Sequence, residues 1–296
     1  MKCKPAWAAV AVSACVFCPR AAGAVTAPVV QTASAQGVQA TVMTKPNELT
    51  GQEPVPVRLT IVDQGQTAFS GPLGVPCNGC ELSPPGPGPL AIQVRDLDTS
   101  GYPQVLVYLD DDGFDFYSTI AIYHRTAAGG YRPLVLRSLY IDDAFLTRVG
   151  VRRIGTGPPV LESSDDRYVP FLSGGEEFAY LPLVVWGYAD GKLTDVSTRY
   201  PVLLRRQAAH ALHNAAVFQR YRLQTPSDIE NPDPRDALAT YAADEARLGH
   251  LATAENELQK ALAEGWLNET SGLTGSRYMR ALNRLLGTRD QRPSVT

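Results

Sequence analysis

The sequence predicts an α+β fold in which a β-rich domain, residues 25–200, is followed by an α-helical region, residues 201–287. Up to residue 200, short apolar or β-branched runs are separated by glycine- and proline-rich turns, which is the pattern of antiparallel strands. After residue 200 the apolar residues recur with helical spacing, and Gly265 and Gly287 stand where two of these segments end. We expect the β-rich domain to form an open sheet or a sandwich. An internal repeat, described below, occurs only twice in this domain, and two repeats of this length cannot close a propeller.

The expected strands follow from these short runs. They are residues 38–42, 55–62, 67–69, 90–94, 105–108, 119–124, 134–140, 181–188 and 192–196. Residues 83–89 consist mostly of proline and glycine and are expected to form a linker or long loop. Asp190-Gly191 predicts a tight hairpin turn between the last two strands.

The expected helices are residues 201–222, 236–248, 253–264 and 276–286, and residues 288–296 are expected to form a flexible tail. The pair that spans residues 236–264 resembles a single tetratricopeptide-like unit, whereas a superhelical peptide groove needs about three such units. We therefore expect the helices to cap the β-rich domain. An adaptor that binds a partner protein through residues 201–287 is the alternative.

The composition excludes two classes of protein. The chain has 296 residues, of which 44% are hydrophobic and 19% are charged, which is too apolar for a disordered protein. The formal net charge of −3 gives no basic surface for nucleic acid. The expected partner is therefore a protein or an envelope component of unknown identity.

Residues 1–24 have the features of a signal peptide. Lys2 and Lys4 precede an almost wholly apolar stretch, residues 5–17, and Ala22-Gly23-Ala24 is a small-residue cleavage site. The mature chain is then expected to begin at Val25 and to be secreted or periplasmic in a bacterium. No later run is long and apolar enough to predict a transmembrane span in the mature chain.

A lipid anchor is an alternative to plain export. Val12-Ser13-Ala14-Cys15 resembles the four residues that end in the lipid-modified cysteine of bacterial lipoproteins. The motif would come after only a short leader, so plain secretion is preferred over an anchor at Cys15.

Two cysteines remain after the leader, Cys77 and Cys80. In an oxidising compartment they are expected to form a local disulfide, whose short loop is favoured by the intervening Asn-Gly. A redox-active pair would need to begin a helix, and the surrounding prolines exclude one.

The segment that begins at Asp96 has the oxygen side chains of a calcium loop. Asp96, Asp98 and Ser100 occupy positions 1, 3 and 5, Gly101 allows the sharp turn at position 6, and Gln104 offers an amide oxygen. Two carboxylates are few for such a loop, so any affinity is expected to be weak, with a dissociation constant on the order of 10⁻⁴–10⁻³ M. A polar turn without metal is the alternative reading.

A displacement of 56 residues places a second segment, residues 152–161, on residues 96–105. Gly157 then matches Gly101, whereas the positions of the expected ligands are held by Arg152, Ile154 and Thr156. The sequence thus indicates an internal repeat in which the turn is retained and the metal ligands are lost.

The Asp loop followed by a strand resembles the calcium loops of FG-GAP/VCBS-like repeats, the integrin-like repeats of secreted proteins. Two later segments, residues 164–168 and 186–201, resemble bacterial secreted proteins of this repeat type, in which helices follow the β region. The resemblance implies two FG-GAP-like repeats and a helical C-terminal region. It implies no assigned activity.

The densest acidic cluster is residues 110–115, which contain four aspartates. It could complete a cation site near Asp96 and Asp98, or it could be a solvated loop. We expect an exported, non-enzymatic binding or structural protein of the bacterial envelope or extracellular space. The alternative is a hydrolase that uses this cluster with a divalent cation.

Overall fold

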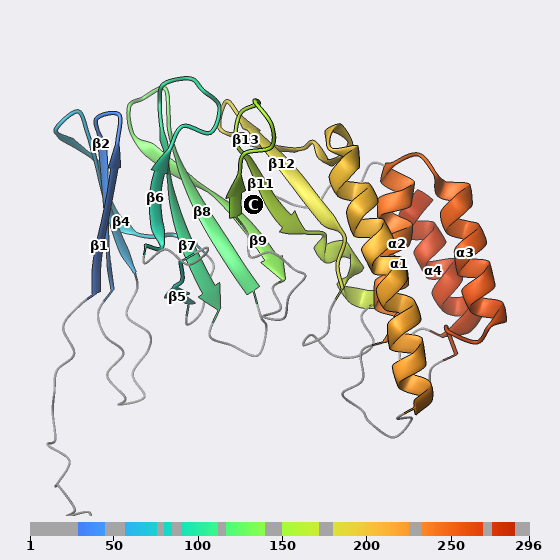
Figure 1. Ribbon diagram of the computed structural model, residues 1–296. Coiled ribbons are helices and arrows are strands. Elements are labelled where there is room, and N and C mark those ends of the chain that lie inside the picture. The colour runs from blue at the N-terminus through green and yellow to red at the C-terminus, as the bar shows by residue number, and fades with distance from the viewer. Residues whose placement is uncertain are drawn as a thin grey trace, which may run out of the picture.

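The computed structural model describes residues 29–44, 57–75, 80–84, 90–111, 117–139, 150–171, 180–224, 233–268 and 274–287. Within these ranges three antiparallel sheets follow one another along the molecule, and four α-helices complete it (Figure 1). The α+β class is therefore confirmed, and the sheets are open. The expected signal peptide, Cys15 and the expected tail lie outside the described residues.

The first sheet is a simple meander of β1 (Val29–Ala35), β2 (Val38–Thr44), β3 (Arg58–Asp63) and β4 (Gln66–Pro72). Two-residue turns, Gln36-Gly37 and Gln64-Gly65, connect β1 to β2 and β3 to β4. Both residues of each turn have positive φ, as the twist of a tight hairpin requires. β1 is a strand that the sequence did not predict, because its small polar residues give little strand signal; it nevertheless pairs with β2 over its full length.

The second sheet contains β5 (Cys80–Leu82), β6 (Ile92–Arg95), β7 (Gln104–Asp111), β8 (Tyr117–Arg125) and β9 (Tyr131–Leu139). The third contains β10 (Gly150–Arg152), β11 (Val160–Ser164), β12 (Leu183–Ala189) and β13 (Lys192–Asp195). The expected Asp190-Gly191 hairpin turn between β12 and β13 is confirmed, with φ of 50° and 70° at its two residues.

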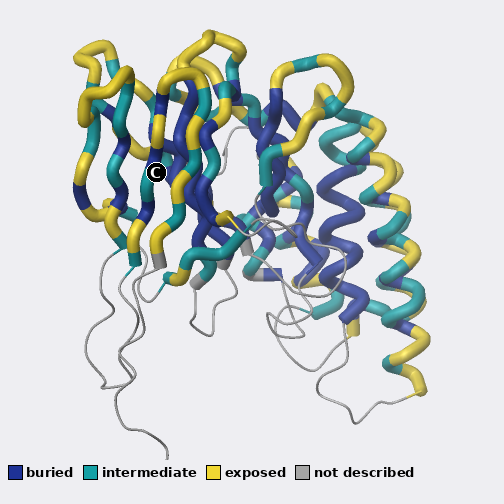
Figure 2. Tube along the Cα trace, turned by 60° about the vertical axis from the view of Figure 1, so that its left-hand side comes forward, coloured by how far each residue is buried: buried dark blue, intermediate teal, exposed yellow. Residues whose placement is uncertain are grey.

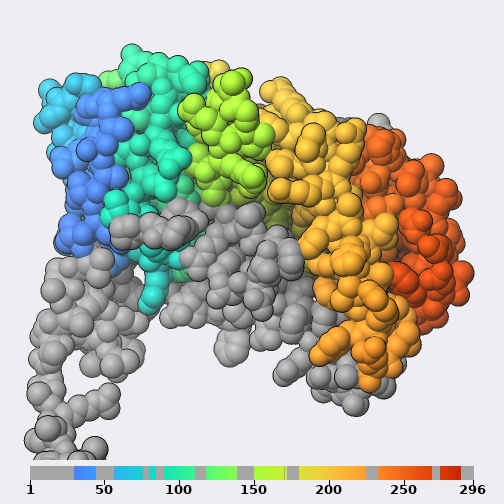
Figure 3. All heavy atoms as spheres, viewed as in Figure 1, coloured from blue at the N-terminus to red at the C-terminus, as the bar shows by residue number. Residues whose placement is uncertain are grey.

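The three sheets pack face to face, and β7 belongs to two cores. Val105 and Val107 point into the core shared with the first sheet, whereas Leu106 and Tyr108 point into the core shared with the third. This alternation follows from the two-residue period of a strand, and it explains why β7 reads as an unbroken apolar run. Buried residues follow the inner strands in Figure 2, and the layers succeed one another in chain order in Figure 3.

The helices are α1 (Pro201–Gln224), α2 (Pro234–Arg247), α3 (Leu251–Ala263) and α4 (Gly275–Gly287). α2 is the central one: every residue from Pro234 to Asp244 is buried, and Asp233 caps its first turn by accepting the N–H of Arg235. Proline and glycine at the helix ends explain why the sequence placed these helices well.

The helical core also contains residues that precede the expected boundary at 200. Tyr168 and Phe171 lie in the 3₁₀ helix η1 (Asp166–Phe171), Tyr180 and Leu181 precede β12, and all four pack among the helices. A second short 3₁₀ helix, η3 (Ser197–Arg199), leads into α1. Residue 200 thus separates the strands from the α-helices, but one hydrophobic core contains residues from both sides of this boundary.

The two segments that the 56-residue displacement relates occupy equivalent places in neighbouring sheets. Residues 96–103 connect β6 to β7, and residues 153–159 connect β10 to β11. Thr99 and Gly155, which are 56 residues apart, have φ of 60° and 67°. Gly157, which was expected to match Gly101, lacks the positive φ of Gly101.

Candidate functional site

A cavity of about 610 Å³ opens where three connections of the β-rich part meet. These are the loop between β6 and β7, the turn between β8 and β9, and the hairpin turn between β12 and β13. Its volume falls in the range of about 300–1,000 Å³ that is typical of small-molecule sites. The second and third sheets both contribute to it, so the cavity depends on their packing.

The Asp loop forms part of this cavity, and its acidic side chains hold the loop in shape. The Asp96 carboxylate accepts the N–H groups of Ser100 at 3.1 Å and Gly101 at 2.8 Å. Oδ1 of Asp98 accepts the same Ser100 N–H at 3.1 Å. These bonds replace the regular pairing that the turn cannot make.

Gln104 closes the loop from its other end. Its Oε1 accepts the N–H of Leu97 at 2.8 Å, and its Nε2 donates to the carbonyl of Tyr102 at 2.7 Å. The residue is only 3% exposed. Gln104, which the sequence suggested as a metal ligand, therefore stabilises the closed shape of the loop.

The remaining expected ligands, Asp96, Asp98 and Ser100, are hard oxygen donors of the kind that calcium prefers. A carboxylate oxygen that accepts one N–H keeps a further lone pair. No group of three or more histidine, cysteine or acidic side chains that could hold a metal occurs within the part of the chain that the structure describes. Calcium binding at this loop stays a prediction.

The acidic cluster at 110–115 does not extend this loop. Asp110 lies near one end of β7 and Gln104 begins the other, and six strand residues span about 20 Å. Asp110 therefore lies too far along β7 to complete a cation site with Asp96 and Asp98. Asp112 and Asp115 lie outside the described residues.

The structure adds residues to the site that sequence reasoning did not assign. Tyr102, His124, Arg132, Tyr188 and Asp190 all line the cavity. They come from three separate hairpin ends, so no spacing in the sequence could group them. The Asp190-Gly191 turn was the one local signal among them.

The turn between β12 and β13 packs directly on His124. A Cβ at Gly191 would lie 2.9 Å from two atoms of the His124 ring, and the φ of Gly191 is +70°. Glycine is therefore needed here both for the backbone conformation and for the close approach. His124 is held against the turn at one side of the cavity.

His124 is a neutral side chain with an unused nitrogen. Burial lowers its pKa below the ordinary 6.5, and the charge of Arg132 lowers it further. Its Nδ1 is buried and has no hydrogen-bond partner in the described structure. Arg132, which pairs with His124 across β8 and β9, makes no ion pair with any described residue.

Two acidic residues of the cavity lining, Asp98 and Asp190, lie close enough to Tyr188 to act on its phenol. Burial raises the pKa of the Tyr188 phenol to about 12, and the nearby charges of Asp98 and Asp190 act in the same direction. The phenol therefore stays protonated. Asp190 makes no side-chain hydrogen bond or ion pair with another described residue.

Arg125 is engaged differently from Arg132. Its Nε lies 3.3 Å from Oδ2 of Asp63, and its guanidinium carbon lies 5.4 Å from the centre of the Tyr102 ring. The ion pair and the cation–π contact hold Arg125 and Tyr102 together at the rim. Tyr102 itself is 59% exposed.

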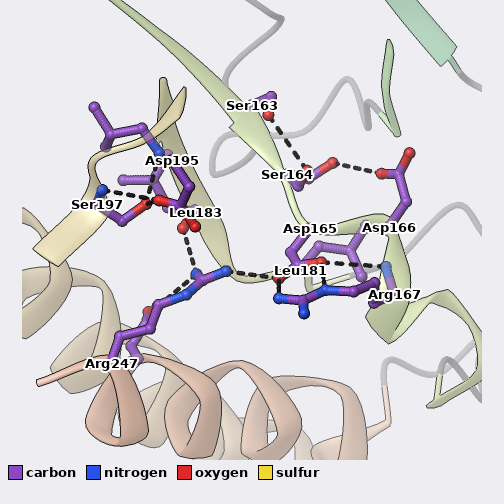
Figure 4. A network of polar contacts seen from close by, with 12 residues as sticks. Ser163, Ser164, Asp165, Asp166, Arg167, Leu181, Leu183, Asp195, Ser197 and Arg247 are labelled. Carbon is purple, nitrogen blue, oxygen red and sulfur yellow. Dashed lines mark hydrogen bonds and ion pairs between the residues drawn. The ribbon is translucent and has the colours of Figure 1, made fainter. Parts of the chain in front are cut away.

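A second polar cluster lies away from the cavity, at the junction of the third sheet and the helices (Figure 4). Its centre is Asp165, which is fully buried. Arg167 donates to both carboxylate oxygens, through Nε at 2.8 Å and Nη2 at 2.6 Å. Arg247 of α2 donates to Oδ2 at 2.6 Å and also to the carbonyl of Leu183. The cluster thus joins η1, β12 and α2.

Asp244 lies beside this cluster and is less well satisfied. One of its oxygens is 3.6 Å from Nη1 of Arg247, and neither has a hydrogen-bond partner among the described residues. Complete burial raises its pKa well above the ordinary value, and the charges of Glu245 and Asp165 add to the rise. Burial thus favours the protonated form of Asp244, against the nearby charge of Arg247.

Cys80 of the expected disulfide and one histidine of α1 also lie outside the two clusters described above. Cys80 is disulfide-bonded, but Cys77 lies outside the described residues, so the Cys77–Cys80 pairing stays a prediction. His210 of α1 contacts the Tyr180 hydroxyl through Nδ1.

Among the described helices none has the length and apolar character to span a membrane. The resemblance to FG-GAP/VCBS-like repeats is not supported by known relatives and stays a prediction. In comparisons with known proteins, no family model, curated protein or solved structure matches this chain.

Proposed function

We propose that this chain is an exported, non-enzymatic binding protein of the bacterial envelope or extracellular space, and that the cavity is its binding site. One observation carries the proposal. The cavity contains two charged groups that the fold does not use: the Arg132 guanidinium and the Asp190 carboxylate. Polar groups without partners that converge in a small-molecule-sized cavity are typical of a binding site.

The surroundings of the cavity are suited to binding. His124, Arg132 and Tyr188 of its lining stand near the ends of β8, β9 and β12, and Figure 2 shows buried residues along the inner strands. Side chains that extend from such strands are held more firmly than side chains on long loops. The Asp165 cluster supports the third sheet from the helical side, so the helices are proposed to reinforce the binding domain.

A weakly bound calcium ion is the second part of the proposal. It rests on Asp96, Asp98 and Ser100, and it would belong to the first of the two expected FG-GAP-like repeats. The loop reaches its shape through its own N–H contacts. Calcium would then offset the charge of the two carboxylates in a turn that is already formed.

The binding function can be tested by thermal unfolding of the full chain with a panel of amino acids, short peptides, sugars, sugar acids and nucleotides. We expect one class to raise the unfolding midpoint of the wild type but not that of the R132Q/D190N double variant. A ligand at 100 times its dissociation constant stabilises the native state by about 2.7 kcal/mol. Equal responses of both proteins, or no response to any compound, would contradict the assignment of the cavity.

Turnover of any compound in this panel bears on the non-enzymatic part of the proposal. Hydrolysis that requires a divalent cation and is lost in D110N would favour the hydrolase alternative over a binding protein. No turnover in the presence of a compound that does bind supports the proposal as stated.

A further inference from the structure

The cavity has one basic side. Arg132 and His124 lie opposite each other on β9 and β8, and both line the cavity. His124 is neutral, so the positive charge of this side comes from Arg132, whose guanidinium is not neutralised by a described acid. A guanidinium can donate two parallel hydrogen bonds to a carboxylate.

The lining of the cavity also carries two acidic side chains. Asp98 and Asp190 come from the second and third sheets and act together on the Tyr188 phenol. The Oδ2 atom of Asp98 is not used by the loop, since only Oδ1 accepts the Ser100 N–H. Two carboxylates near tyrosine rings form a favourable environment for an ammonium group.

The charges of both signs in the lining select against several kinds of ligand. A purely anionic ligand would gain from Arg132 but would meet the repulsion of Asp98 and Asp190. A purely cationic ligand would meet Arg132. An uncharged ligand would displace water from three charged groups without replacing their charge-assisted hydrogen bonds. A ligand with both charges, separated by a short polar chain, satisfies all three.

On the basis of the binding function proposed above, we propose that the cavity binds a small zwitterion of the size of a short peptide. Its carboxylate would lie at Arg132 and its ammonium group between Asp98 and Asp190. A cavity of about 610 Å³ is larger than one amino acid requires, so a peptide of two to four residues fits it better.

The test uses four probes with the same tripeptide backbone and different terminal charges. These are triglycine, N-acetyl-triglycine, triglycinamide and N-acetyl-triglycinamide, titrated into the full chain at neutral pH by calorimetry. We expect triglycine to bind, and the loss of either terminal charge to weaken binding about ten- to hundredfold, because each removes a charge-assisted hydrogen-bond pair. Equal affinities for the four probes, or tighter binding of a singly charged probe, would overturn the proposal.

Variants connect each charge to its residue. R132Q is expected to bind triglycine and triglycinamide equally, because neither gains from a guanidinium. D98N/D190N is expected to bind triglycine and N-acetyl-triglycine equally; asparagine at 98 can still accept the Ser100 N–H, which keeps the loop closed. R205Q, which changes an exposed arginine on α1 outside the cavity, is the matched control and should bind like the wild type.

The outcomes separate the ligand class from the binding function. If triglycine does not bind at 10 mM while another compound of the panel stabilises the wild type but not R132Q/D190N, the zwitterion proposal is wrong and the binding function stands. If no probe and no panel compound binds, both are wrong. Loss of triglycine binding in R205Q as well would show that the effect is not specific to the cavity, and would overturn the proposal.

Discussion

Two polar clusters in this protein are built from the same residue types but differ in how far their groups are satisfied. Around Asp165, two arginines donate to one buried carboxylate, and Arg247 uses a further N–H on a backbone carbonyl. Around the cavity, Arg132 and Asp190 remain without such partners in the described structure. The first cluster is closed and the second is open.

The difference shows what each cluster can do. Buried ions that are fully hydrogen-bonded fix the elements that carry them, because any displacement would leave a charge unpaired at high cost. The closed cluster therefore joins the third sheet to α2. Groups that are exposed and unpaired cost little in the native state and remain available, so the open cluster can bind a ligand.

The largest expected effect comes from breaking the closed cluster. D165N removes the fully buried charge that Arg167 and Arg247 share. We expect this to be the largest loss of the series in the free energy of unfolding, about 2–4 kcal/mol, measured by urea denaturation.

D190N is the matched variant in the open cluster. The same chemical change at an exposed and unpaired carboxylate should alter the free energy of unfolding by no more than about 0.5 kcal/mol. Asparagine also tolerates the φ of 50° at this position. Similar losses in D165N and D190N would mean that the two clusters do not differ in the way described.

A smaller effect is expected at the turn that forms one edge of the cavity. G191A combines the strain of a positive φ with a Cβ 2.9 Å from the His124 ring, and should cost about 2 kcal/mol. G65A is the control: Gly65 has a φ of +81° in a similar two-residue turn, but no atom lies within 4 Å of its added Cβ.

The difference between G191A and G65A in urea denaturation isolates the contact with His124. G191A should also weaken ligand binding, because His124 must move, whereas G65A should not. Equal losses of stability with unchanged binding would show that the turn does not position the cavity.

Asp244 gives the junction a dependence on pH. Burial raises its pKa in the native state, so the native state binds a proton more tightly than the unfolded chain does. The stabilisation is complete below the unfolded pKa of about 3.9, and is lost as the pH rises toward the raised native value. D244N cannot ionise and should not show this decline.

The test is urea denaturation of wild type and D244N at several pH values from 4 to 8. We expect the difference in free energy of unfolding to move in favour of D244N as the pH rises. A difference that stays constant across the pH range would contradict the raised pKa of Asp244. Arg247, Glu245 and Asp165 are present in both proteins, so their contributions cancel in the comparison.

The sequence predicted the helices and the class of fold well because the signals are local. Proline and glycine mark the ends of α2 and α4, and Asp190-Gly191 marks a hairpin. β1 was missed because its stability comes from pairing with β2 and not from its own small residues. Strand β12 starts at Leu183, two residues later than predicted, because Leu181 is drawn into the helical core and Pro182 has no N–H to donate.

The cavity could be predicted only in part, for a physical reason. The Asp loop was visible because its residues are adjacent in sequence and share one turn. His124, Arg132 and Tyr188 come together only when the second and third sheets pack. The sequence treated His124 as a lone strand-end residue, since neither Arg132 nor Gly191 is recognisable as its neighbour from spacing.

The smallest expected effect concerns calcium and compares the Asp loop with its counterpart, residues 153–159. With a dissociation constant on the order of 10⁻³ M, 10 mM calcium would stabilise the native state by about 1.4 kcal/mol. We expect this shift in the unfolding midpoint of the wild type relative to chelator, and its loss in D96N. Asparagine still offers one acceptor to the loop, so the variant removes charge more than shape.

Ser100 and Thr156 form the matched pair for this comparison, because they stand at the same position of the two connections. S100A should reduce the calcium response and T156A should leave it unchanged. A response that persists in both D96N and S100A would place the ion elsewhere. No response in the wild type at 10 mM calcium would mean that the Asp96 carboxylate serves only to accept the N–H groups of Ser100 and Gly101. Both connections would then be turns without metal, and their difference in charge would matter only for the ligand in the cavity.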